Sequence, residues 1–174
     1  MFFRSMKVWI AATVLVVLVL AGTAIGVHVT SSTSFCLSCH EMRVHQQELA
    51  LSPHAQDARG NAIECVQCHI PSTNIVRMLS AKTWLGTKDL WVHATTGGSV
   101  TLNRREIQPE ARRFMDDANC RACHEDLYRN AKNDGAISEY GRLAHDNYLD
   151  KNGSSRSGCA GCHRNIAHLP PEDR

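Results

Sequence analysis

The 174-residue sequence predicts a mainly α-helical chain with extensive irregular loops, in which one N-terminal transmembrane helix precedes a compact domain of short helices. The transmembrane helix is predicted by an uncharged apolar run over residues 8–27. As a helix, this run is long enough to cross a hydrocarbon layer of about 30 Å. The compact domain is predicted by four copies of one cysteine motif and by an aromatic content of 6%, which is low for a conventional core.

The apolar run is expected to remain in the protein as a membrane anchor. Arg4 and Lys7 precede it, which favours a cytoplasmic N-terminus. A cleaved signal peptide is the alternative, because residues 20–24 resemble a processing site, but the run is longer than a typical signal core. The anchor interpretation divides the chain into residues 1–7 in the cytoplasm, 8–29 in the membrane and 30–174 outside the cytoplasm.

Four copies of Cys-x-x-Cys-His use all eight cysteines of the chain. This motif is the attachment site of c-type haem, in which the two thiols bind one porphyrin and the histidine reaches its iron. Zinc sites, redox pairs and disulfides would not require a histidine after every cysteine pair. We therefore expect four covalently bound haem c groups, attached through Cys36, Cys39, Cys65, Cys68, Cys120, Cys123, Cys159 and Cys162, with His40, His69, His124 and His163 as candidate iron ligands.

Four haems must share one small domain. About 145 residues follow the apolar run, too few for four separate domains. Porphyrin faces are therefore expected to form much of the core. The motifs occur as two pairs separated by a connector of about fifty residues, which predicts a multihaem cytochrome c domain built as two dihaem halves. The net charge is +2 with both signs interspersed, so nothing indicates binding of nucleic acid.

Three helices are expected between the motifs, over residues 41–51, 72–94 and 137–149. The second has apolar residues at helical spacing, with Ser72 or Thr73 as its cap. Gly97-Gly98 should end it, and Gly86 is a candidate for a break in its middle. Its apolar face could lie along a membrane interface, where Trp is favoured, or pack on haem, and both alternatives remain open.

A low-spin haem iron requires a second axial ligand, usually His or Met. Six histidines lie outside the motifs: His28, His45, His54, His93, His145 and His168. The best candidates are His54, His145 and His168, and the last follows its own motif too closely to bend back over the same ring. His93 is a further candidate, and the remaining two are expected to be structural. Met42, in Cys-His-Glu-Met, is either a thioether ligand or a packing residue.

Several of these stretches together resemble the NapC/NirT/NrfH family of membrane-anchored tetrahaem quinol dehydrogenases. They are the single membrane helix, the four motifs, and three specific segments that extend the motifs. The segments are Cys36-x-x-Cys-His-Glu-Met42, Cys65-x-x-Cys-His-Ile-Pro71 and Cys159-x-x-Cys-His-Arg-Asn-Ile-Ala-His168-Leu-Pro. The resemblance covers essentially the whole chain.

The resemblance implies a quinol pocket beside the first haem, with Met42 as its axial ligand in place of the motif histidine. Lys82 and Asp89, seven residues apart, match the pocket lysine and aspartate of the nitrite-reductase-linked branch in type and spacing. Without the resemblance they would be read as solvated helix charges.

The resemblance also implies distal ligands for the other haems. His54 would match the ligand of haem 4, and His168 that of haem 3. The connector between the third and fourth motifs is longer here than in the nitrite-reductase-linked branch. His145 in this connector could therefore supply the haem 2 ligand from within the chain. No ligand from the partner protein would then be needed, which favours a transient partner.

The expected function is that of a quinol dehydrogenase subunit of a respiratory reductase system in the bacterial inner membrane. Such a protein oxidises menaquinol or ubiquinol and passes electrons from a periplasmic haem domain to a reductase of nitrate, nitrite or a similar acceptor. The alternatives are an anchored relay without a quinol site, a member that works in reverse and reduces quinone, and a small terminal reductase acting at an open iron. Both a homo-oligomer and a hetero-complex with the reductase remain open.

Overall fold

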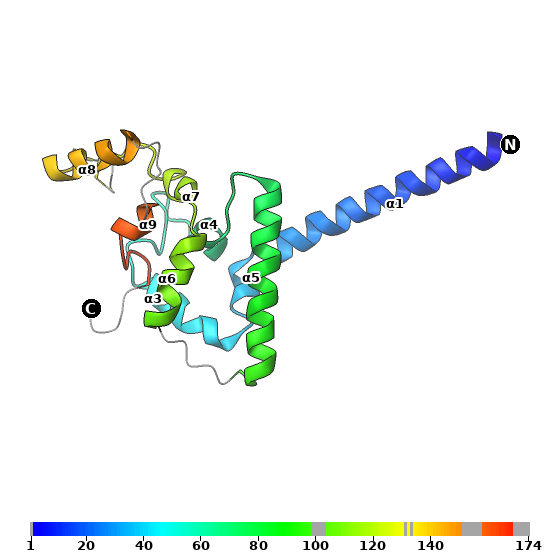
Figure 1. Cartoon of the computed structure of the whole chain (residues 1–174), viewed down its shortest axis with the longest axis horizontal. Helices are drawn as coiled ribbons and strands as arrows, with labels where there is room; N and C mark the ends of the chain where they lie inside the picture. The colour runs from blue at the N-terminus through cyan, green and yellow to red at the C-terminus, as the bar shows by residue number, and fades with distance from the viewer. Residues whose placement is uncertain (1, 99–103, 131, 133, 151–157, 169–174) are drawn as a thin grey trace.

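The computed structural model describes all residues except 1, 99–103, 131, 133, 151–157 and 169–174 (Figure 1). The described part is helical and contains no β-strand, as expected, and its sheet-like pairs are two isolated bridges, Gln56–Ala62 and Arg129–Ala136. In chain order the helices are α1 (Phe2–Val29), α2 (Thr33–Cys36), the 3-10 helix η1 (His40–Met42), α3 (Arg43–Ala50), α4 (Cys65–His69), α5 (Ile75–Thr96), α6 (Arg104–Phe114), α7 (Asp117–Arg121), α8 (Glu139–Asp150) and α9 (Gly158–Cys162).

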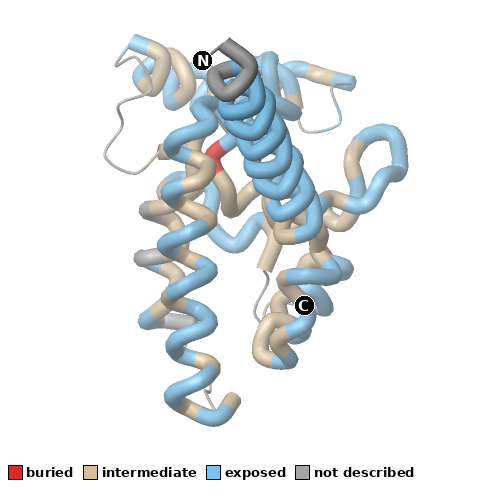
Figure 2. The backbone as a smooth tube through the Cα atoms, turned by 90° about the vertical axis from the view of Figure 1, so that its right-hand side faces the viewer, coloured by how far each residue is buried: buried red, intermediate tan, exposed pale blue. Residues whose placement is uncertain are grey.

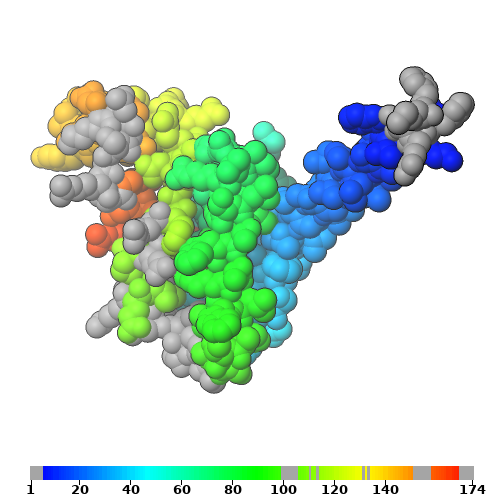
Figure 3. Space-filling view, turned by 45° about the vertical axis from the view of Figure 1, so that its right-hand side comes forward, coloured from blue at the N-terminus to red at the C-terminus, as the bar shows by residue number. Residues whose placement is uncertain are grey.

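Helix α1 projects away from the rest of the molecule as one unbroken rod (Figures 1 and 3). Within Met6–Val29 the most apolar stretch of 18 residues has a mean hydropathy of 2.6, and none of that stretch is buried by other parts of the chain. The hydroxyls of Thr13 and Thr23 donate to carbonyls one turn earlier, so their polar groups are satisfied within the helix. An apolar surface exposed on every side is suited to lipid rather than water.

The domain beyond α1 buries almost nothing with its own side chains (Figure 2). Among the described residues, no aliphatic, aromatic or sulfur-containing side chain is fully buried. The buried positions are Glu48, Ser52 and Pro71. A polypeptide of this size normally needs an apolar core to offset the entropy of folding. These helices therefore require large apolar groups between them, as the four haem motifs predict.

Helix α5 confirms the second predicted helix but differs from it in two details. Its cap is Asn74, whose side-chain oxygen accepts the N–H groups of Val76 and Arg77 at 2.8 and 3.2 Å. The predicted caps, Ser72 and Thr73, instead bind side chains of the segment that begins α7.

Of the two predictions made from glycines in α5, the end at Gly97 is confirmed and the break at Gly86 is wrong. The helix continues through Gly86 without a break, because one glycine costs only about 1 kcal/mol relative to alanine within a long helix. It ends at Gly97, whose left-handed φ of 59° suits a residue without a side chain.

The other two predicted helices are present with small shifts. The helix expected over residues 41–51 is η1 followed by α3, and the one expected over residues 137–149 is α8, which carries His145. Helix α6 was not among the predicted helices, and it contains Pro109, which lacks a backbone donor.

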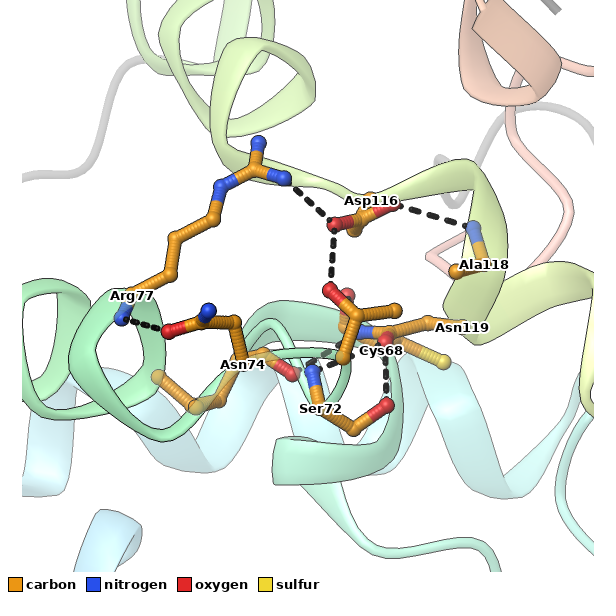
Figure 4. Close-up of polar contacts among 9 residues, drawn as sticks. Cys68, Ser72, Asn74, Arg77, Asp116, Ala118 and Asn119 are labelled. Atoms are coloured by element: carbon orange, nitrogen blue, oxygen red, sulfur yellow. Dashed lines mark hydrogen bonds and ion pairs between the residues drawn. The ribbon is translucent and has the colours of Figure 1, made fainter.

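A polar junction joins the second haem motif to the third (Figure 4). Asn119 of α7 accepts the hydroxyl of Ser72 at 3.0 Å and donates to the carbonyls of Ile70 and Cys68 at 2.9 and 3.3 Å. Asp116 forms an ion pair with Arg77 of α5 at 2.9 Å. These contacts fix α4, α5 and α7 together although about fifty residues separate the two motifs along the chain.

Candidate haem-binding site

Three of the four motifs close the same backbone turn. Helix α4 contains the whole second motif, and in the third and fourth motifs the histidine N–H donates to the carbonyl of the first cysteine, at 2.9 Å for His124 and 2.8 Å for His163. This turn projects the two thiols and the imidazole from one short helical segment. All eight cysteines are free thiols, as covalent attachment of haem requires.

The first motif has a different backbone. Helix α2 ends at its first cysteine, and Cys39 is extended, with φ −85° and ψ 125°. His40 then begins η1, and 62% of its side-chain surface is exposed. The first motif therefore presents its histidine from a different direction than the other three.

The motifs contact one another in pairs, and both pairs use the same capping contact. In the first pair, the hydroxyl of Thr33 accepts the N–H of Cys65 at 3.2 Å. In the second pair, Asp117 accepts the N–H of Cys159 at 2.8 Å. Thr33 and Asp117 each lie three residues before the first cysteine of their own motif, so equivalent residues join the members of each pair.

The cysteine side chains extend these contacts from the first motif to the last. The thiols of Cys36 and Cys65 interact, and this interaction raises the pKa of Cys36 and lowers that of Cys65. Burial raises the pKa of Cys68, and the charge of Cys120 adds to this shift, so these two thiols are also neighbours. Burial likewise raises the pKa of Cys120, and its side-chain interaction with Cys159 opposes this shift, so these two thiols are neighbours as well. The order of the motifs in space therefore follows their order in the sequence.

Three motif histidines each face one histidine from outside the motifs. The ring centroids are 6.0 Å apart in each pair: His69 with His168, His124 with His54, and His163 with His145. Two imidazoles bound to one metal through nitrogens about 2 Å from it would have centroids roughly 6 Å apart. The three pairs therefore have the separation of axial ligands on opposite sides of one iron.

The three outer histidines also share one hydrogen-bonding pattern. The Nδ1 atoms of His54, His145 and His168 contact the backbone carbonyls of Ile166, Leu127 and His45, respectively. An Nδ1–H that donates to a carbonyl fixes the ring and leaves Nε2 as the free ligand atom. Burial also lowers the pKa of His69 to about 4, which favours the neutral imidazole that binds metals.

These ring pairs differ from the distal ligands that the resemblance implies. His168 faces the second motif rather than the third, His54 faces the third rather than the fourth, and His145 faces the fourth rather than the second. Spacing along the chain could not reveal this, because the segments that carry these histidines pack against motifs other than their neighbours in the sequence. His45, expected to be structural, lies beside the buried carboxylate of Glu48 with Nδ1 to Oε2 at 3.5 Å.

His40 and His93 form a fourth ring pair with centroids 6.3 Å apart, but this pair is organised differently. Glu41 joins the two rings, at 2.8 Å from Nδ1 of His93 and 3.5 Å from Nδ1 of His40. A methyl group added to Gly98 would lie 2.9 Å from Cε1 of His40 and 3.3 Å from Cε1 of His93. A porphyrin plane between these rings would therefore meet Gly98, so the arrangement does not suit a haem held by His40 and His93.

Lys82 lies where the membrane helix meets the domain. Its Nζ donates to the hydroxyl of Ser31 at 2.7 Å and to the carbonyl of Val27 at 3.4 Å. Partial burial lowers its pKa, which the nearby Cys36 opposes. Asp89 lies two turns further along the same face of α5, and desolvation raises its pKa. Both predicted pocket residues thus lie on the face of α5 that carries His93. The contact of His93 with Glu41 is not predicted by the sequence, although Glu41 belongs to the Cys-His-Glu-Met segment.

Comparison with protein families gives a match to the NapC/NirT cytochrome c family, N-terminal region, over residues 2–173. The chain belongs to this family. It is 29% identical over 153 residues to the tetraheme c-type cytochrome CymA of Shewanella oneidensis, covering 83% of this chain and 80% of CymA. It is 31% identical to the cytochrome c-type protein TorY of Escherichia coli O157:H7, covering 83% of this chain but only 39% of TorY.

Among solved structures, the chain resembles one in the cytochrome c nitrite reductase NrfHA complex bound to the HQNO inhibitor. The TM-score is 0.51 at 27% identity, with 92% of this chain and 89% of that chain covered. As a NapC/NirT family member, the chain is a haem c electron-transport protein, and the part that the structure describes has one candidate membrane helix. The eight free thiols and the three ring pairs fit this cofactor.

Proposed function

We propose that this NapC/NirT family member is a single-pass, membrane-anchored cytochrome with four haem c groups, which oxidises membrane quinol and passes the electrons to a periplasmic reductase. Haem c supplies the capacity to take up and release one electron at a time. The cysteines would hold four haems, and three of the irons would be ligated by His69 with His168, His124 with His54, and His163 with His145.

The first haem site would be different. The extended Cys39 and the position of Gly98 between His40 and His93 support Met42, rather than His40, as an axial ligand there. A thioether ligand raises the reduction potential relative to a second imidazole. Replacing Met42 with Leu should therefore change the near-infrared magnetic circular dichroism of one haem, whereas His40→Gln should leave the ligand signals unchanged.

The contact between Lys82 and the end of α1 is the observation that carries the quinol-oxidising function. It brings a titratable group, the thiol Cys36 of the first haem motif and the candidate membrane span to one place. A lipid-soluble quinol could reach this place without leaving the membrane. Lys82 and Asp89 would bind its hydroxyl groups and accept its protons.

The test replaces Lys82 with Met and Asp89 with Asn in the full chain, reconstituted in lipid nanodiscs. Menaquinol and ubiquinol analogues should reduce the wild-type haems, seen in the α band, and the double variant should lose at least about tenfold in rate. Dithionite should still reduce both proteins fully. The matched control changes Lys132 to Met and Asp134 to Asn, which removes the same charges from exposed positions in the last connector.

The same experiment separates the rival functions. A relay without its own quinol site would show no quinol reduction in the wild type, although dithionite would reduce it. A member working in reverse would oxidise its reduced haems with quinone faster than it accepts electrons from quinol. HQNO, the inhibitor in the related structure, should slow quinol reduction of this protein as well.

A further inference from the structure

Helix α5 carries large apolar residues on its exposed face, where a helix that faces water normally carries charged and polar residues. The face turned away from the rest of the domain includes eight exposed residues that lie within about 120° of one another on a helical wheel. They are Val76, Ser80, Thr83, Trp84, Thr87, Leu90, Trp91 and Ala94, and we call them the outer face of α5. Trp84, Leu90 and Trp91 are 62%, 65% and 70% exposed, respectively.

The charges of α5 lie elsewhere. Lys82 points to the end of α1, Lys88 is half-buried, and Arg77 at the edge of the face forms an ion pair with Asp116. Asp89 lies on the opposite side of the helix from Trp84 and Trp91. A helix on the surface of a soluble domain normally shows the reverse pattern, with its charges outward and its apolar stripe inward.

The position of α5 indicates what covers this face. In Figure 1 the other domain helices lie on one side of α5, while α1 leaves on the other side and runs across the direction of α5. The contact of Lys82 with Val27 and Ser31 fixes the middle of α5 to the end of the candidate membrane span. When α1 crosses a bilayer, α5 therefore extends along the bilayer surface with its outer face toward the lipid.

We propose that α5 is an interfacial membrane helix, with its outer face immersed in the headgroup and upper acyl region of the bilayer into which α1 inserts. Tryptophan is favoured at this depth, and an uncharged face of threonines and aliphatic residues incurs no cost of charge burial. This placement depends on α1 spanning the membrane and is independent of whether the protein oxidises quinol. It would hold Lys82 and Asp89 at the depth of the headgroups.

The proposal is tested by photolabelling the full holoprotein in nanodiscs that contain a phospholipid with a diazirine on its acyl chain. Mass spectrometry should find lipid adducts on α1 and on peptides of the outer face of α5. The yield on α5 should exceed that on α8 by roughly tenfold, although Tyr140 of α8 is 87% exposed.

Two matched variants sharpen the test. Thr83→Glu with Thr87→Glu places two carboxylates on the outer face and should lower the α5 adducts at least roughly fivefold, with the α1 adducts unchanged. Tyr140→Glu with Ala144→Glu places the same charges one turn apart on α8 and should change neither. An unchanged haem spectrum shows that each variant is folded. If a variant does not fold, the comparison of α5 with α8 in the wild-type protein still tests the proposal. The proposal would be overturned if α1 were labelled but the adduct yield on α5 were no higher than that on α8. Cross-linking of α5 to a second copy of the chain would also overturn it.

Discussion

His54, His145 and His168 come from three different segments of the chain, yet each has its Nδ1 against a backbone carbonyl and its ring 6.0 Å from a motif histidine. The side chain alone does not distinguish a ligand from a surface histidine. The combination of an Nδ1–carbonyl contact and a facing imidazole supports the proposed ligation, because it leaves one nitrogen free for a metal at the separation that the metal requires.

Replacing His145 with Ala should remove one axial ligand from the haem of the fourth motif. We expect one additional high-spin signal in the electron paramagnetic resonance spectrum, an open iron that binds cyanide, and three unchanged haems. The control is His28→Ala, at an exposed position on α1. A spectrum of His145→Ala identical to that of the wild type would show that His163 has another partner.

The carboxyl of Asp89 leads to a prediction about pH. Desolvation raises its pKa above that of an ordinary aspartate, so the protonated form persists to higher pH. Only the carboxylate can accept a proton, and the rate of quinol oxidation should therefore rise with pH through the raised pKa. Steady-state rates of Asp89→Asn should lose this dependence, whereas Asp57→Asn, in a loop where Asn61 lowers the pKa of the aspartate, should retain it. An unchanged pH profile in Asp89→Asn would exclude Asp89 as the acceptor.

At the scale of the elements, α5 shows both what sequence can predict and where it stops. Apolar spacing and the glycine pair located the helix to within a few residues. The sequence does not identify its cap, because Ser72, Thr73 and Asn74 are all good capping residues, and only the contacts with α7 decide among them. That decision depends on residues more than forty positions away.

Asn74 should stabilise α5 measurably. Loss of the cap in Asn74→Ala should cost about 1 kcal/mol, whereas Asn74→Asp, which keeps a side-chain acceptor, should cost little. The thermal transition, followed by circular dichroism in the Soret region, should fall by several degrees only for the alanine variant. Equal transitions in the two variants would assign the stability of this end of α5 to its contacts with α7.

For the site, the sequence predicted the attachment residues and the outer histidines that face them, but not which histidine faces which motif. Each motif is a local signal of five residues, so its chemistry can be recognised without a fold. The pairing of His168 with His69, in contrast, joins the end of the chain to its second motif. The contact of Glu41 with His93 likewise depends on how α5 packs against η1.

At the scale of the whole molecule, the described polypeptide has a chain of contacts between haem motifs in place of an apolar core. The contacts of Thr33 and Asp117 with the N–H groups of Cys65 and Cys159 repeat at equivalent positions before the first and third motifs. Lys82 joins this motif chain to the candidate membrane helix at one end. The arrangement suits a path for electrons that begins at the membrane and leads away from it.

The intact mass of the mature protein, measured together with its Soret absorbance, tests the central claim most directly. We predict the mass of the polypeptide with four haem groups attached through thioether bonds, resistant to acid–acetone extraction. The same spectrum would reveal whether α1 is retained. The mass of the bare polypeptide without Soret absorbance, or of a chain with fewer than four haems, would contradict the account.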